Sequence, residues 1–162
     1  MPRPYYNKYP KYNYKKSRHV DKKLLVSSGP LAANTQANTI LYTAPVACTL
    51  KGLRINGSLN GTTINANANI SWAVLVVREG RIPNSINTGT SGDFYVPEQE
   101  VWAWGVGKAA TLTTTGDNSW IYEFDIAPGT SRKMEEGDKL YISIVSDDPA
   151  DALINTQVFA YQ

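Results

Sequence analysis

From Leu24 onward the chain consists of short apolar or alternating segments separated by clusters of Gly, Asn, Pro, Asp and Ser. No stretch repeats apolar residues at helical spacing for three turns. Alternation with a period of two is typical of β-strands, in which successive side chains point to opposite faces of a sheet. The body of the chain is therefore predicted to be all-β.

The clearest strand is predicted at residues 69–78, where apolar residues follow one another with almost no polar interruption. This pattern is typical of a central strand buried on both faces, and Trp72 is predicted to lie in the core. Trp120 to Ile126 alternates, with the aromatic residues on one side and the acidic residues on the other. Lys139 to Val145 alternates in the same way, with Leu140 on the side predicted to face the core.

Weaker patterns predict the remaining elements. The glycine at Lys51-Gly52 coincides with a slip of the alternation and predicts a β-bulge, and Trp102 and Trp104 are predicted to share one strand face. A long surface loop is expected over Glu79 to Tyr95. The further strands expected are Leu24 to Ser28, closed by Gly29-Pro30, and Thr39 to Thr43, Ala47 to Ser58, Glu100 to Val106 and Leu153 to Tyr161.

About eight strands at this spacing predict one antiparallel β-sandwich, either a jelly roll or an immunoglobulin-like module. The chain has a single cysteine, Cys48, so it lacks the cysteine pair around a tryptophan that is typical of many immunoglobulin domains. Long loops also favour the jelly roll. We therefore expect a jelly-roll domain over residues 24–162, preceded by an arm over residues 1–23.

Charge divides the chain at the same place. The first 23 residues carry +7 and the other 139 carry −5, although the whole chain carries only +2. Five of the ten tyrosines and three prolines stand between the cations, and the first aliphatic residue is Val20. The basic residues of the arm are Arg3, Lys8, Lys11, Lys15, Lys16, Arg18, Lys22 and Lys23, and its tyrosines are Tyr5, Tyr6, Tyr9, Tyr12 and Tyr14.

Such an arm cannot build a core and is expected to stay extended until it meets a polyanion. Counterion release from phosphates supplies the attraction, and tyrosine rings stack on unpaired bases of any sequence. The arm is therefore predicted to bind single-stranded nucleic acid. The alternatives are a solvated terminus or a nuclear-import address, which Lys15-Lys16-Ser17-Arg18 and Lys22-Lys23 would fit.

The sequence predicts no enzyme and no cofactor. The one histidine, His19, lies in the arm, where no pocket can orient it as a base, and a zinc site from His19 and Cys48 is not expected. Glu98 and Glu100 would share a strand face, as paired carboxylates of glycoside hydrolases do, but Pro97 favours a loop there. An acidic turn either is plain turn chemistry or holds calcium; its residues are Asp147, Asp148 and Asp151.

Apolar runs are too short for a membrane span, and the N-terminus lacks the apolar stretch of a signal peptide. With one cysteine, the fold is expected to depend on packing rather than disulfides. Folding inside a cell or its nucleus is the expected setting, with no membrane partner.

Several motifs together resemble the small capsid proteins of Rep-encoding circular single-stranded DNA (CRESS-DNA) viruses. They are the runs Val74-Leu75-Val76-Val77-Arg78-Glu79-Gly80, Tyr95-Val96-Pro97-Glu98-Gln99-Glu100-Val101-Trp102, Thr130-Ser131-Arg132-Lys133-Met134 and Gly137-Asp138-Lys139-Leu140. The resemblance extends over nearly all of the body.

The resemblance implies a jelly-roll subunit whose basic arm contacts DNA inside a small icosahedral shell. Identical subunits, single-stranded DNA and host import machinery would be its partners, and virion and host nucleus its locations. About 60 copies would bring roughly 420 arm charges to the genome.

Candidate subunit contacts follow from the same resemblance. Arg78 and Glu79 would either close a strand end by pairing with a nearby carboxylate or set the register of a contact. Arg132 and Lys133 would either bridge to Glu135, Glu136 or a neighbour's acids, or be solvated. The apolar anchors expected at the interface are Ile82, Phe94, Tyr95 and Val96.

A carbohydrate-binding module with a basic tail is the rival interpretation, because β-sandwiches that bind sugars use aromatic platforms. Two exposed coplanar rings at Trp102 and Trp104 would support it. Burial of both rings would leave the module without its platform.

Overall fold

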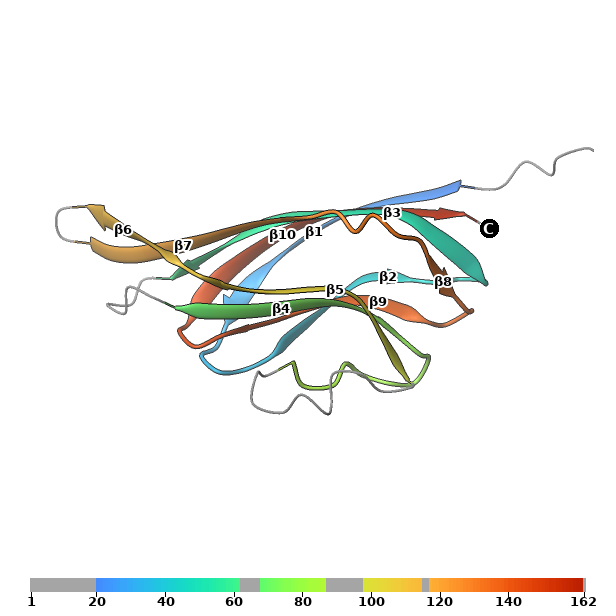
Figure 1. Ribbon diagram of the computed structural model, residues 1–162, viewed down its shortest axis with the longest axis horizontal. Coiled ribbons are helices and arrows are strands. Elements are labelled where there is room, and N and C mark those ends of the chain that lie inside the picture. The colour runs from blue at the N-terminus through green and yellow to red at the C-terminus, as the bar shows by residue number, and fades with distance from the viewer. Residues whose placement is uncertain (1–19, 62–67, 87–97, 115–116, 162) are drawn as a thin grey trace, which may run out of the picture.

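The computed structural model describes residues 20–61, 68–86, 98–114 and 117–161, which form a two-layered β-sandwich (Figure 1). Side chains of residues 20, 21, 112–114, 117 and 118 are not described. All strand pairs are antiparallel. Over the described ranges there is no helix long and apolar enough to cross a membrane.

Within the described ranges, ten strands are divided between a six-stranded and a four-stranded sheet. The six-stranded sheet contains, in spatial order, β1 (Val20–Leu31), β10 (Ala150–Tyr161), β3 (Cys48–Gly61), β7 (Asp117–Ile126) and β6 (Ala110–Thr114), with the short β8 (Arg132–Met134) also paired to β3. The four-stranded sheet contains β2 (Ala37–Thr43), β9 (Lys139–Ser146), β4 (Asn69–Val77) and β5 (Gln99–Lys108).

The order of pairing is that of a jelly roll. The first strand pairs with the last, β2 pairs with β9, and β4 pairs with β5 at the turn of this nested arrangement. A long hairpin folded over on itself gives this order, because its successive strand pairs alternate between the two sheets: β1 with β10 and β3 with β7 lie in one, β2 with β9 and β4 with β5 in the other. The predicted all-β jelly roll is confirmed, with β6 and β8 added to the eight strands of the basic pattern.

The main core lies between the sheets. Leu50 and Ile55 enter it from β3, Trp120 from β7, Ile142 from β9 and Val158 from β10, and each is at most 1% exposed. The alternation predicted for Trp120 to Ile126 and for Lys139 to Val145 is confirmed, because the apolar side of each segment faces this core.

Strand β4 is buried on both faces over most of its length, as its sequence predicts. Val74 faces the main core, whereas Ala73 and Leu75 belong to a second cluster on the outer face of the four-stranded sheet. Trp72 is half-buried at the margin of the main core and donates its indole N–H to the hydroxyl of Tyr122 at 3.2 Å. The core position predicted for Trp72 is thus only partly confirmed.

Among the described strands, two of the three register shifts concern side chains whose direction the sequence predicts. Lys51 is the extra residue where β3 passes the Phe159/Ala160 step of β10, so the predicted bulge is confirmed. A second shift in the pairing of β4 with β5 makes Trp102 the extra residue, and here the prediction was wrong. Because the bulge reverses the alternation, Trp102 is 6% exposed and Trp104 is 58% exposed.

Two segments differ from their expected extents. Strand β1 begins at Val20 and continues through Gly29 and Pro30 to Leu31, so it is longer than the predicted strand at Leu24 to Ser28. Residues 79–86 have no strand, as expected of a loop, but Ile86 is buried against the outer face of the four-stranded sheet. The rest of the expected loop, from 87 to 95, lies outside the described residues.

Candidate nucleic-acid interface

The arm enters the body through an edge strand. Lys22 and Lys23 belong to β1, which has β10 as its only partner in the sheet order among the described residues. Val20 lies opposite Tyr161, so the arm joins the body beside the last strand. The other predicted arm residues lie outside the described residues. They are Arg3, Lys8, Lys11, Lys15, Lys16 and Arg18, with Tyr5, Tyr6, Tyr9, Tyr12 and Tyr14.

Around this junction, four strands place lysines and aromatic rings on the outer face of the six-stranded sheet. We call this surface the arm-proximal face and define it by Lys22 of β1, Lys51 of β3, Lys133 of β8, and Phe159 and Tyr161 of β10. Cross-strand partners share a face. Lys22 lies opposite Phe159, and Thr49 lies opposite both Tyr161 and Lys133, so the register brings these residues together.

Two of the lysines lie over the two rings. The ammonium nitrogen of Lys22 is 5.4 Å from the ring centroid of Phe159, and that of Lys51 is 5.2 Å from the centroid of Tyr161. Both distances are within the range of cation–π attraction. The Phe159 ring packs over Gly52, where a Cβ atom would lie 3.1 Å from it. Glycine next to the bulge therefore leaves room for this ring.

The charge of the arm-proximal face is not neutralised within the described side chains, since no ion pair joins Lys22, Lys51 or Lys133 to a carboxylate there. The neighbouring cation differs. Arg54 forms an exposed ion pair with Asp125 at 3.0 Å, and the hydrogen bond and charge of that carboxylate raise the pKa of the Arg54 guanidinium.

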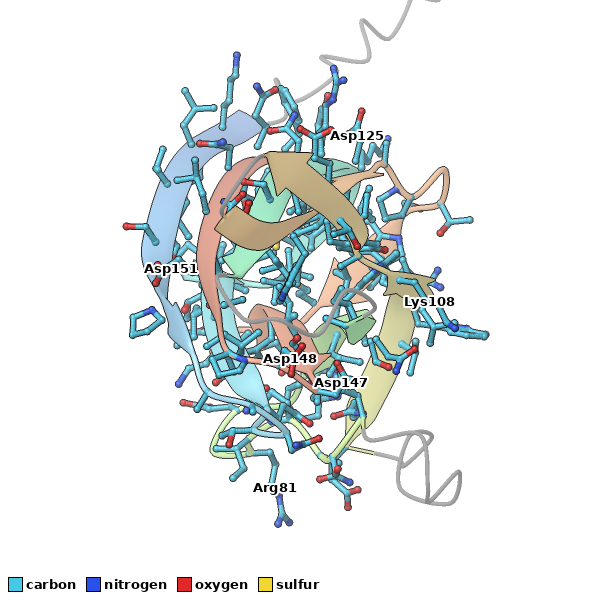
Figure 2. The ribbon with its side chains drawn as sticks, turned by 90° about the vertical axis from the view of Figure 1, so that its left-hand side faces the viewer. Arg81, Lys108, Asp125, Asp147, Asp148 and Asp151 are labelled. Atoms are coloured by element: carbon cyan, nitrogen blue, oxygen red, sulfur yellow. The ribbon has the colours of Figure 1, made fainter. Side chains whose placement is uncertain are left out.

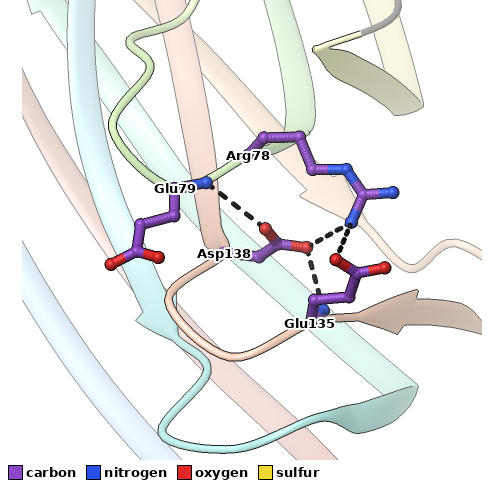
Figure 3. Close-up of polar contacts among 4 residues, drawn as sticks. All are labelled: Arg78, Glu79, Glu135 and Asp138. Carbon is purple, nitrogen blue, oxygen red and sulfur yellow. Dashed lines mark hydrogen bonds and ion pairs between the residues drawn. The ribbon is translucent and has the colours of Figure 1, made fainter.

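A cluster of polar contacts joins the end of β4 to the turn before β9 (Figure 3). Asp138 is 2% exposed and accepts hydrogen bonds from the Arg78 guanidinium at 2.8 Å, the Glu79 amide at 3.3 Å and the Glu135 amide at 2.9 Å. Glu135 also approaches Arg78 at 3.7 Å. The prediction that Arg78 closes a strand end by pairing with a carboxylate is confirmed.

The predicted bridge from Arg132 to Glu135 or Glu136 was wrong, whereas a bridge to a neighbour's acids stays a prediction. The Arg132 guanidinium pairs with Glu100 of β5 at 2.6 Å rather than with Glu135 or Glu136. Lys133 is exposed and belongs to the arm-proximal face. Because successive side chains of a strand point to opposite faces of the sheet, Arg132 and Lys133 lie on different surfaces.

Among the expected interface anchors, Ile82 is 78% exposed. Phe94, Tyr95 and Val96 lie outside the described residues.

In the acidic turn, the carboxylate of Asp147 is occupied by contacts within the chain. Asp147 accepts hydrogen bonds from the backbone and side-chain amides of Asn69 at 2.7 and 2.6 Å. Asp147 and Asp148 lie close together, whereas Asp151 lies farther away toward β1 (Figure 2). In the part of the chain that the structure describes, no three His, Cys, Asp or Glu side chains are grouped as a metal site would require.

The structure also bears on the paired carboxylates, the zinc site and the carbohydrate platform considered from the sequence. Glu100 is held by Arg132, and Glu98 precedes β5 and accepts the Arg78 amide at its carbonyl. His19 lies outside the described residues, and Cys48 is buried. The bulge places Trp102 inside and Trp104 outside, so these two rings form no shared platform.

No family model matches the chain, and no curated protein matches it. Among solved structures, the VP2 subviral particle of infectious bursal disease virus aligns at 12% identity and a TM-score of 0.27. The Gx strain of the same virus aligns at 14% identity and a TM-score of 0.30. Each alignment covers 99% of this chain and 42% of the other, so this chain spans less than half their length. TM-scores this low establish no common fold, and the jelly roll is assigned from its own strand order.

The sequence pointed to the arm but missed the arm-proximal face. Phe159 and Tyr161 resembled ordinary residues of a last strand, and Lys51 and Lys133 were isolated surface lysines. Only the register of β10 against β1 and β3, and of β8 against β3, brings them together. The slip at Lys51-Gly52 was the single local signal.

Proposed function

We propose that this chain is a capsid protein that forms a closed shell of identical subunits and packages single-stranded nucleic acid through its arm. One observation carries the proposal: a segment of charge +7 is joined to a jelly-roll body of charge −5 through an edge strand. The resemblance in sequence to CRESS-DNA capsid proteins favours DNA as the cargo, import into the host nucleus and about 60 copies in the shell.

Strand β1 also supplies a surface for assembly. Leu24 is 66% exposed and Val26 69%, and Leu153 of the neighbouring strand is 43% exposed. An edge strand offers unpaired backbone groups to another chain, and apolar side chains beside it add burial on contact. We infer that β1 meets a second subunit, with Arg78, Glu79, Ile82, Arg132, Phe94, Tyr95 and Val96 as further candidate contacts.

Assembly is tested on the full chain by light scattering and electron microscopy at moderate salt, with and without nucleic acid. Shells are expected, and monomers under every condition would overturn the proposal. Val26→Lys places a charge on β1 and should prevent assembly while the fold survives, as measured by circular dichroism. Asn60→Lys is the control, because Asn60 is an exposed polar residue on β3, which has a neighbouring strand on each side.

Packaging is tested by neutralising the arm in the full-length chain. Nucleic acid recovered with the purified shells should fall strongly, because counterion release scales with the number of cations at the phosphates. Unchanged nucleic-acid content would show that the arm does not package it. The cations changed to glutamine are Arg3, Lys8, Lys11, Lys15, Lys16 and Arg18.

A further inference from the structure

We propose that the arm-proximal face itself binds single-stranded nucleic acid, so that a strand held by the arm continues across the body. The inference rests on the proposed function and extends its site to described residues. The occupant follows from charge and chemistry: three lysines without a carboxylate partner among the described side chains surround two aromatic rings. Lysines neutralise phosphates, and unpaired bases stack on aromatic rings.

Position supports the same occupant. Lys22 lies in the strand that continues the arm, and Val20 pairs with Tyr161, so a strand leaving the arm meets these rings first. Farther along the sheet, Asp125 neutralises Arg54. The cationic surface therefore ends where that ion pair begins.

The lysine–ring pairs suggest how the surface binds. One side of the Phe159 ring is packed over Gly52, and the Lys22 ammonium lies over the ring. An exposed ammonium gains less from a ring than a base gains by stacking on it. When a strand arrives, the lysine exchanges the ring for a phosphate and a base takes its place. Lys51 and Tyr161 can make the same exchange.

Stacking of this kind reads no base edge, since every base has a π-face. The arm-proximal face is therefore expected to prefer single strands over duplexes and to show little sequence preference. Duplex DNA keeps its bases stacked on one another and can use only the lysines.

The charge component is tested on the full-length chain with an unstructured oligothymidylate of about 30 nucleotides, a length that exceeds one small binding site. Lys51→Gln with Lys133→Gln should lower the slope of log K against log salt by about 1.4, because each phosphate that a lysine neutralises contributes about 0.7 to that slope. The matched control is Arg81→Gln with Lys108→Gln. Arg81 follows β4 and Lys108 ends β5, so both exposed cations lie with the four-stranded sheet, and the control should leave the slope unchanged.

The stacking component is tested with Phe159→Leu and with Tyr161→Leu. Each should weaken oligothymidylate binding by roughly five- to a hundredfold with the salt slope unchanged. Photocrosslinking of the parent should attach thymine to the peptide that contains these rings. Thermal melting of each variant separates loss of binding from loss of fold, and the lysine pair tests the surface independently of ring packing.

The outcomes distinguish the two proposals. If the parent chain does not bind the oligonucleotide, both the packaging function and this inference fail. If the parent binds, and the lysine pair and the ring variants bind as the control does, the arm acts alone and only this inference is overturned.

Discussion

The outer faces of the two sheets differ sharply. On the six-stranded sheet, Lys51, Arg54 and Gln157 are exposed, whereas on the four-stranded sheet Leu75 and Tyr141 are buried. Both outer faces are formed by strands with alternating or continuous apolar residues, so secondary structure alone does not explain why one face is buried and the other exposed. The chain covers part of one face with its own loop, whereas the other face is exposed.

Hydrogen bonds hold the covering loop in place. The side chain of Gln36 accepts the Ile86 amide at 2.8 Å and donates to the Asn84 carbonyl at 2.9 Å, and the buried Gln99 accepts the Asn84 amide at 2.9 Å. Residues far apart in sequence thus fix Ile86 against β4 and β9. Around Leu75 and Tyr141 the four-stranded sheet is therefore buried on both sides, whereas Trp104 and Val106 remain exposed on β5.

The largest expected effect comes from Leu75→Ala, which tests whether the covered face is a true core. Because Leu75 is fully buried, its truncation should lower the free energy of unfolding by about 2–5 kcal/mol. Asn155→Ala on the open face should change it by less than about 0.5 kcal/mol. Denaturant unfolding measures both, and equal effects would remove the distinction between the faces.

A somewhat smaller loss is expected for Asp138→Ala, because Asp138 holds the amide of Glu79, where the covering loop begins. Losing the acceptor of two backbone amides and Arg78 should cost about 2–4 kcal/mol. Arg78→Ala leaves the buried Asp138 carboxylate with its two backbone amides and should cost less than Asp138→Ala, about 1.5 kcal/mol. Thermal and denaturant unfolding compare the two variants, and a larger effect at Arg78 would contradict this assignment.

A smaller effect than that of Asp138→Ala should come from Gln36→Ala, which removes two hydrogen bonds to the covering loop without touching either sheet's core. A loss of about 1–2 kcal/mol is expected, together with faster hydrogen exchange at the Ile86 amide. Gln157→Ala, an exposed glutamine on the open face, serves as the control. Unchanged exchange at Ile86 would mean that Gln36 does not hold the loop.

Much of the fold was predictable because alternation and apolar runs report burial directly. The two buried faces of β4, the core side of β7 and the bulge at Lys51 were all readable from local sequence. The bulge at Trp102 was not, because it arises from the register against β4, a non-local property. The packing of Ile86 was hidden for the same reason.

The candidate site likewise has a part that local sequence predicts and a part that depends on strand pairing. The arm was evident from charge and tyrosine content, since those are properties of composition. The pairing of Arg132 with Glu100 and the gathering of Lys51, Lys133 and Tyr161 depend on which strands become neighbours. A single sequence without the sheet order does not contain that information.

The pairing of β1 with β10 has a consequence for biogenesis. On the ribosome, the strand that carries the arm is made early, but its hydrogen-bonding partner begins only at Ala150. Contacts so distant in sequence make folding slow and leave early strands exposed meanwhile. Until translation reaches β10, both β1 and β3 lack a neighbour in the six-stranded sheet, so a polyanion that engages the nascent arm would find a chain still open to misassembly.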